Sequence, residues 1–415
     1  MRSSEMKQAV VEQAVEQTAA KNTVANKTVS KRDAELLDIR VALNPCDSER
    51  MPFDFTINPY RGCAFACRYC YARYTHEWLG LNGAEEFDKR VLVKKNFAAV
   101  LERDLARMRG TKRATRPTIA IGTATDPYQP LEHRYGLTRQ ALELLAEESG
   151  QGLSGLKVSI TTKSDLVVRD IPILKRIAAN NCLRVHLSLT TLDRDLARKL
   201  EPGAPSPRTR ISAIATLARA GIAVDAFVMP IIMGLTDSEE NLDALFGALA
   251  AAGVRTAVCE ALFLRAPTRD VFFEFLNEEL PDAAPLLEQR YHGNVYAPPI
   301  FVERLQARVR RLRRKWQLLG PLKTIDPARA VTRESAREAS YGSSPAHSPL
   351  RYRGHSLQSS SKSKLGDVRP TGGVRSRETR VPSSSIPSRR TPRPPREDAP
   401  GTRQLGFGFG EESQE

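Results

Sequence analysis

Three of the six cysteines in this 415-residue chain, Cys63, Cys67 and Cys70, lie within one short segment. Thiolates bind soft metals and iron–sulfur clusters, so three of them on one loop are enough to hold a metal centre. A closed zinc site or a conventional cubane cluster takes four protein ligands, and no fourth cysteine or histidine follows at comparable spacing. The spacing therefore predicts a [4Fe–4S] cluster with three protein ligands and one iron left open for a substrate or cofactor.

A structural zinc site is the alternative, because His76 stands six residues beyond Cys70 and could supply a fourth ligand. In that case the metal would only fasten a loop. The remaining cysteines, Cys46, Cys182 and Cys259, are far apart in the chain. A disulfide framework is therefore not expected.

The segments that must position the cysteines alternate in type between residues 50 and 265. Patterns typical of strands occupy residues 52–58, 118–122, 156–163, 183–190, 222–229 and 254–263, and helical periodicity occupies residues 96–109, 138–149, 166–179, 206–221 and 238–253. This alternation predicts an α/β fold with parallel strands, either an open doubly wound sheet or a barrel. Both folds place their chemistry at the carboxyl ends of the strands, and the cysteines directly follow the first strand.

The strand predicted at residues 183–190 favours the barrel. Its apolar residues alternate with His186, Ser188 and Thr190, whereas a parallel strand covered by helices on both faces is continuously apolar. One polar face indicates a strand that lines a cavity. A buried hydroxyl group whose hydrogen bonds are satisfied within the core would give the same pattern.

The segment at residues 57–78, "INPYRGCAFACRYCYARYTHEW", resembles the radical S-adenosylmethionine (SAM) superfamily. The resemblance rests on the C-x3-C-x-aromatic-C pattern directly after the first strand of a six-fold βα alternation. It implies a partial (β/α)6 TIM-like barrel of the radical SAM type over residues 36–265, with disordered N- and C-terminal extensions. It also implies that SAM binds the open iron, and that one-electron reduction of the cluster cleaves SAM to a 5′-deoxyadenosyl radical.

Three further segments are similar to the DNA repair photolyase-like branch of that superfamily, which includes spore photoproduct lyase, and specifically to actinobacterial long forms with a basic disordered tail. They are "GTATDPYQPLEHRYGLTR", "ITTKSDLVVRD" and "LEPGAPSPRTRISAIATLARAGI". The resemblance implies the following roles: cluster ligation by Cys63, Cys67 and Cys70, packing near cofactor and substrate by Tyr69 and Tyr71, contact with the methionine moiety by Thr125 and Asp126, and contact with the cofactor carboxylate and ribose by Lys163 and Ser188.

One position departs from that branch. Spore photoproduct lyase carries Cys-Thr-Ser-Asp at the end of its second strand, and this cysteine donates the hydrogen atom that completes repair. Here the run is "TATD", which begins at Thr123. The O–H bond of threonine is too strong for that donation, so thymine-dimer reversal by the same mechanism is not expected. Cys259 on the sixth strand is a candidate substitute donor, although a cysteine buried as a small apolar residue gives the same sequence.

The ends of the chain differ in composition from the centre. We expect a poorly ordered segment at residues 1–35, a helical extension at 266–321 and a disordered Ser-, Pro- and Arg-rich tail at 322–415. No signal peptide and no run of 18 apolar residues are found, which predicts a cytoplasmic protein without membrane contact. No G-x-G-x-x-G segment lies between a predicted strand and a following helix, and no Walker loop occurs, so classical dinucleotide or nucleotide binding has no support.

Charge and composition indicate partners. The net charge of +15 is compatible with a nucleic acid, DNA in particular, although solubility alone gives a similar excess. Residues 303–316 form a helical pattern with six Arg and one Lys, which is either a solvated last helix or an edge that faces phosphates. The resemblance implies an electron donor such as flavodoxin or ferredoxin. Residues Gln404–Phe409 are similar to the glutamine-leucine-aromatic peptides that bind the sliding clamp.

The leading hypothesis is therefore a lyase-like radical SAM enzyme that acts on a nucleic acid lesion or a modified base. A second hypothesis keeps the radical chemistry but assigns a tRNA or protein substrate. The third is a non-enzymatic nucleic-acid-binding protein in which the metal only fastens a loop.

Overall fold

The computed structural model describes residues 34–48, 51–109, 111, 116–151, 153 and 155–319. The predicted tail and the Gln404–Phe409 segment lie outside the described residues, as do residues 1–33. Within the described ranges, no helix is long and apolar enough to cross a membrane.

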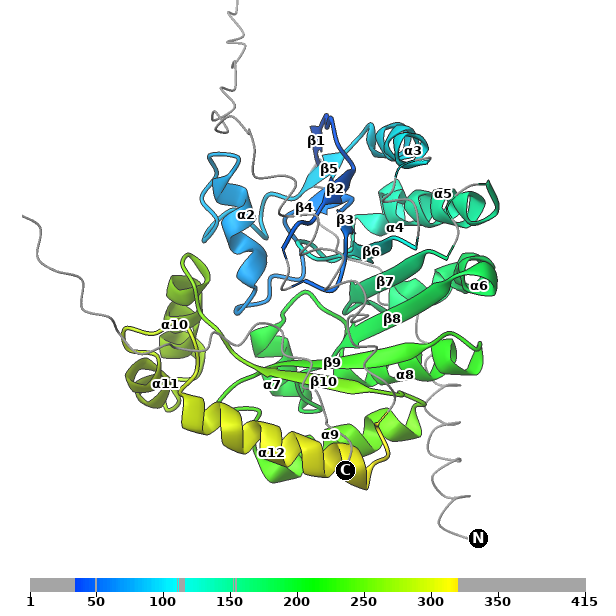
Figure 1. Ribbon diagram of the computed structural model, residues 1–415. Coiled ribbons are helices and arrows are strands. Elements are labelled where there is room, and N and C mark those ends of the chain that lie inside the picture. Colours follow the sequence, from blue (N-terminus) through cyan, green and yellow to red (C-terminus); the bar gives the residue numbers. More distant parts are fainter. Residues whose placement is uncertain are drawn as a thin grey trace, which may run out of the picture. The chain divides into compact units, whose positions relative to one another are not determined.

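Six parallel strands form the centre of the fold (Figure 1). They are β3 (Phe55–Ile57), β6 (Thr118–Ile121), β7 (Lys157–Thr162), β8 (Cys182–Ser188), β9 (Val224–Ile231) and β10 (Ala257–Ala261), and β2 (Leu43–Pro45) pairs antiparallel to β3. Their order in the sheet, β10-β9-β8-β7-β6-β3-β2, follows the chain without a reversal. A doubly wound sheet requires such a reversal, so the barrel alternative is confirmed. Since β10 does not pair with β2 or β3 in the described sheet, the barrel is partial.

Helices between successive strands cover one face of the sheet (Figure 1). The five longest are α3 (Phe97–Met108), α5 (Leu137–Gln151), α6 (Ile171–Asn180), α8 (Pro207–Arg219) and α9 (Glu239–Ala251). Shorter helices that also lie between strands in the sequence are α2 (Tyr74–Glu77), α4 (Glu132–Tyr135) and α7 (Arg194–Leu200). The hydroxyl groups of Ser206 and Ser238 cap α8 and α9 by accepting hydrogen bonds from backbone N–H groups of the first turn. Each of the two helices ends before a glycine with positive φ, Gly221 or Gly253.

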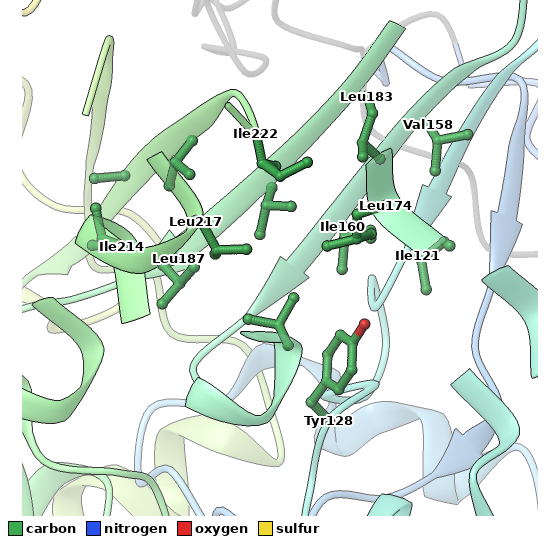
Figure 2. Packing of buried hydrophobic residues seen from close by; sticks show 14 of the residues in the cluster. Ile121, Tyr128, Val158, Ile160, Leu174, Leu183, Leu187, Ile214, Leu217 and Ile222 are labelled. Atoms are coloured by element: carbon green, nitrogen blue, oxygen red, sulfur yellow. The ribbon is translucent and has the colours of Figure 1, made fainter. Parts of the chain in front are cut away.

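Aliphatic side chains fill the space between these helices and the sheet. Figure 2 shows Ile160 and Leu187 from neighbouring strands beside Leu174 of α6 and Leu217 of α8. All four side chains are completely buried. Removal of this apolar surface from water is the main force that holds each helix against its strand.

The opposite face of β8 is polar, as its alternation predicts. Arg184 donates to Asp225 of β9 over 2.6 Å. The ring of His186 packs edge-on against Phe227, and both of its ring nitrogens are buried without a hydrogen-bond partner. Burial lowers the pKa of His186 to about 4, which keeps the ring neutral at physiological pH.

A second, smaller sheet includes a strand that directly follows β3 in the sequence. It contains β1 (Glu35–Leu37), β5 (Leu92–Lys94) and β4 (Tyr60–Arg61), in the order β1-β5-β4. The sequence does not predict it, because strands of two or three residues are too short to show periodicity. Strand β4 leads directly into the cysteine segment, so this sheet fixes where that segment begins.

Three helices follow the barrel: α10 (Thr268–Glu279), α11 (Ala284–Arg290) and α12 (Pro299–Lys315). The basic helix α12 is not simply solvated or turned toward phosphates, because part of its charge is paired with α9. Arg308 and Arg311 form ion pairs with Glu239, and Lys315 forms one with Asp243. These cations serve to dock the helix, while Arg304, Arg310 and Arg314 remain exposed.

Replacement of Gly247 in α9 by alanine should destabilise the protein. A Cβ atom there would lie 2.9 Å from the Trp316 ring, whose Nε1 donates to Asp243. Glycine to alanine in a helix interior normally adds about 1 kcal/mol of stability, so the clash predicts a reversed sign. Urea unfolding of the Gly247→Ala variant measures it. In a Trp316→Leu background, the same substitution should stabilise; a gain in the wild-type background would contradict the packing described.

Candidate active site

The cysteine loop follows β3 and β4 at the carboxyl edge of the sheet. Its turns are tight: Gly62 and Ala66 have positive φ values, and Cys70 N–H donates to the Cys67 carbonyl. A Cβ atom on Gly62 would lie 2.5 Å from the Phe87 carbonyl oxygen, so only glycine fits there. The loop therefore has a defined backbone path that presents all three thiols within a short distance along the chain.

Burial sets the chemistry of the three thiols. Cys63 and Cys67 are buried, Cys70 is half-buried, and none forms a disulfide. Burial raises the pKa of Cys67 to about 12 and also raises those of Cys63 and Cys70. Thiolates in such surroundings need nearby positive charge, which iron supplies when it binds. The donor set thus fits a cluster whose charge replaces the protons.

The zinc alternative finds no support in the geometry. His76 is completely buried, its Nε2 donates to the Arg90 carbonyl over 3.0 Å, and its ring packs edge-on against Phe87. Among the described residues, no three His, Cys, Asp or Glu side chains are placed to hold a single metal ion. In a cubane cluster each cysteine binds a different iron atom, so its ligands need not converge on one point.

Thr125 and Asp126, the predicted site residues after β6, form hydrogen bonds with other segments of the chain. The Thr125 hydroxyl donates to the Gly62 carbonyl, which Gln129 also contacts over 3.2 Å. Asp126 accepts three hydrogen bonds, from the Thr162 hydroxyl and from backbone N–H groups of residues 128 and 163. Thr125 therefore braces the cysteine loop, and Asp126 fixes the end of β7 beside it.

Lys163, at the end of β7, brings a cation to the thiols. Its Nζ lies 5.7 Å from the centre of the Tyr69 ring. Burial lowers the pKa of Lys163, but the neighbouring Cys67 and Glu201 outweigh this effect and raise it overall. No ion pair between Lys163 and a carboxylate is found in the part of the chain that the structure describes. A half-buried ammonium without such a partner is suited to receive an anionic group from a ligand.

A buried ion pair lies beneath the loop, between Glu201 and Arg210. The two side chains are 0% and 1% exposed. The Tyr69 hydroxyl donates to Glu201, and Arg210 donates to the Ser188 carbonyl over 3.1 Å. This pair connects the cysteine loop with the end of β8. Ser188 is itself buried there, so the geometry brings Tyr69 and Lys163 to the cysteine loop and connects Ser188 with it through the ion pair.

Glu201 and Arg210 are not among the predicted site residues, although the sequence carries a signal for them. In α8, Arg210 precedes Ala213, Ile214 and Leu217 by three, four and seven residues, which places it on the buried face of the helix. A charged residue on such a face needs a buried partner. The partner belongs to the segment just before the helix, where Gly203 N–H also donates to the Phe65 carbonyl.

Thr123 is the residue that the resemblance matches with the donor cysteine of the branch. Its hydroxyl accepts a hydrogen bond from the Asn58 side chain over 3.1 Å, and its carbonyl accepts one from the Tyr71 hydroxyl. Tyr71 is 47% exposed and lies at the rim of the site rather than inside it. The Thr123 hydroxyl is thus held by the chain next to the cysteine loop.

The structure does not bring Cys259 to this group. It lies in the apolar core between β10 and the helices, with Leu305, Val309 and Leu312 of α12. Its neighbour Glu260 points to the other face, and burial raises the pKa of Glu260 to about 7. A role for Cys259 as hydrogen-atom donor therefore has no geometric support, and the small-apolar alternative describes it better.

Comparison with known proteins agrees with this geometry. A family model described as the radical SAM superfamily matches residues 57–247. An uncharacterised protein of Mycobacterium tuberculosis is 39% identical over 277 residues, which cover 67% of this chain and 78% of the relative. An uncharacterised protein of Methanocaldococcus jannaschii is 31% identical over 49% of this chain and 71% of its own. The radical SAM Nα-GlyT isomerase of Pseudomonas phage M6 is 30% identical, over 50% and 38% respectively.

Solved structures show the same fold in spore photoproduct lyase. A single-site variant of that enzyme superposes with a TM-score of 0.52 at 19% identity, over 68% of this chain and 79% of the other. A double variant with bound S-adenosylmethionine and dinucleoside spore photoproduct gives a TM-score of 0.50 at 18% identity, over the same shares.

Neutralising Glu201 should destabilise the chain strongly. The Glu201→Gln substitution leaves Arg210 buried without a counter-charge, which costs about 3–5 kcal/mol in the free energy of unfolding. Denaturant unfolding of the cluster-free chain measures this loss. Glu239→Gln is the matched control, because Glu239 pairs with Arg308 and Arg311 at the surface and its loss should cost no more than about 1 kcal/mol per pair. Equal losses in the two variants would contradict a structural role for the buried pair.

Proposed function

The chain belongs to the radical SAM superfamily, and we propose that it is an enzyme that acts on a damaged or modified base in a nucleic acid. Proteins of this superfamily use a [4Fe–4S] cluster and S-adenosylmethionine. When both are bound and an electron donor such as flavodoxin or ferredoxin reduces the cluster, they supply a 5′-deoxyadenosyl radical that abstracts a hydrogen atom from the substrate.

The observation that carries the proposal is the grouping of three thiols, two of them buried, with the Lys163 ammonium at the carboxyl edge of the barrel, where no described carboxylate pairs with it. Cys63, Cys67 and Cys70 would hold the cluster. Lys163 would bind the carboxylate of the cofactor, and Ser188 would contact its ribose. Tyr69 would shape the wall of the site, while Asp126 and the Glu201–Arg210 pair would keep these groups in place.

A nucleic acid substrate is supported by two further observations. The chain is basic, and spore photoproduct lyase, which has the same fold, binds a dinucleoside lesion. The radical chemistry on a tRNA or a protein remains the alternative, and no contact in the site favours it. A non-enzymatic role fits less well, since a loop that only needed fastening would not require beside it the Lys163 ammonium, which no described carboxylate pairs with.

Thr123 bears on the class of reaction. Without a thiol at this place, the hydrogen atom that ends the reaction must come from another donor, such as the 5′-deoxyadenosine formed earlier. Return of that atom would regenerate S-adenosylmethionine, as suits a rearrangement. If an external thiol supplied the atom instead, as in a lyase-like reaction, 5′-deoxyadenosine would accumulate with each turnover. Whether 5′-deoxyadenosine accumulates with product distinguishes the two.

The test of the proposed function is anaerobic reconstitution with iron and sulfide. The wild-type chain should bind a [4Fe–4S] cluster and release 5′-deoxyadenosine from S-adenosylmethionine on reduction, faster when the correct nucleic acid is present. Cys67→Ala should lose both cluster and cleavage, because two thiolates do not hold a cubane. Cys182→Ala, altered at the opposite end of β8, should keep both. Stoichiometric zinc without 5′-deoxyadenosine would refute the proposal.

A second prediction concerns Thr123 directly. With dinucleoside spore photoproduct as substrate, the wild-type chain should form no thymine dinucleotide above the enzyme-free background. The Thr123→Cys substitution places a weak S–H bond beside the cysteine loop. This variant should form thymine dinucleotide in measurable amounts, as followed by chromatography. Thr123→Ser is the control, since it keeps the O–H group. Efficient conversion by the wild type would show that this position does not decide the outcome.

A further inference from the structure

A row of aromatic rings leads from the candidate active site to the surface. Tyr71 lies 6.0 Å from Phe263 between ring centres, and Phe263 lies 6.2 Å from Tyr296. Tyr71 and Tyr296 are 47% and 46% exposed, although aromatic rings of this size are usually buried. We call these three residues the aromatic row.

The row begins at the rim of the candidate active site. Tyr71 follows Cys70 directly and donates a hydrogen bond to the carbonyl of Thr123. Phe263 lies just beyond the end of β10, and it forms an isolated β-bridge with Tyr296. The three rings therefore come from segments far apart in the sequence that meet at the carboxyl edge of the barrel.

A cation extends the row. Arg265 is exposed and donates to the Tyr296 hydroxyl over 3.0 Å, and no carboxylate pairs with it among the described residues. Beside it lies a pocket of about 450 Å³, lined in part by Arg265, Arg269 and Asn294. Arg269 is held by two backbone carbonyls and by the Phe273 ring, so its charge is fixed in place.

We propose that the aromatic row and Arg265 form a stacking surface for unpaired nucleotides that flank the reacting one. This proposal rests on the proposed function and specifies the form of its substrate. Every nucleobase offers a flat face to an aromatic ring, and a guanidinium group can stack on a base or pair with phosphate. Bases inside a duplex already stack on one another, so the surface favours single-stranded or locally opened nucleic acid.

A protein partner fits this surface less well. An apolar peptide would leave the guanidinium group of Arg265 without a counter-charge when it covered the row. A phosphate backbone supplies that charge at each nucleotide, and the chain as a whole is basic. The pairing of flat apolar rings with an available cation therefore matches a nucleic acid strand.

The test is fluorescence anisotropy with a labelled single-stranded oligonucleotide and with its duplex at equal salt concentration, using the reconstituted full-length chain. Single strands should bind more tightly than the duplex. Tyr296→Ala and Arg265→Ala should each weaken single-strand binding about tenfold and change duplex binding less. Leu36→Ala and Arg314→Ala, which alter an exposed apolar residue and an exposed cation elsewhere, should have no such selective effect. The basic tail is present in every variant and cancels in the comparison.

The same samples separate this inference from the function on which it rests. Equal binding of both strand forms, unchanged in Tyr296→Ala and Arg265→Ala, would overturn the stacking surface; if nucleic acid still stimulated cleavage of S-adenosylmethionine, the proposed function would stand. If neither strand form bound or stimulated cleavage, the nucleic acid substrate itself would be refuted, and the stacking surface with it. Loss of binding in the two variants with normal cluster content would support the surface.

Discussion

The buried ion pair of Glu201 and Arg210 is the constraint on which the site depends. Removing two charges from water costs several kcal/mol for each ion, and the cost is offset only when each charge has good partners. Here Glu201 also accepts from the Tyr69 hydroxyl, and Arg210 also donates to the carbonyls of Pro205 and Ser188. Tyr69 belongs to the cysteine loop and Ser188 ends β8, so satisfying the charges fixes both.

This arrangement explains how the loop that carries the three thiols keeps its conformation. Two backbone hydrogen bonds join it to the segment that carries Glu201, from Arg68 N–H to the Leu200 carbonyl and from Gly203 N–H to the Phe65 carbonyl. A Cβ atom on Gly203 would lie 2.2 Å from the Ala64 carbonyl oxygen, so the two segments are in direct contact. The ligands are thus positioned largely by the protein, which reduces the ordering that cluster binding must impose.

The fold was predictable where the signals are local. The six parallel strands and the five longest helices between them follow from periodicity. The polar face of β8 favours a barrel, and the order of the strands is that of a barrel. The contact between Tyr69 and Glu201 spans 132 positions, so no local pattern could place these groups together. The face of β10 on which Cys259 lies could not be predicted either, because the strand is mostly apolar. Glu260 is the one polar residue that marks its other face.

The total charge of the chain says less about function than the positions of its individual cations. The net charge of +15 predicts an anionic partner only in general terms, and the most basic helix, α12, uses Arg308, Arg311 and Lys315 to bind α9. What matters for function is which cations have no carboxylate partner and where they lie. Among the described residues, Lys163 stands beside the thiols, and Arg265 stands at the outer end of the aromatic row. Their positions, rather than the total charge, connect the proposed cofactor site with the proposed path of the substrate.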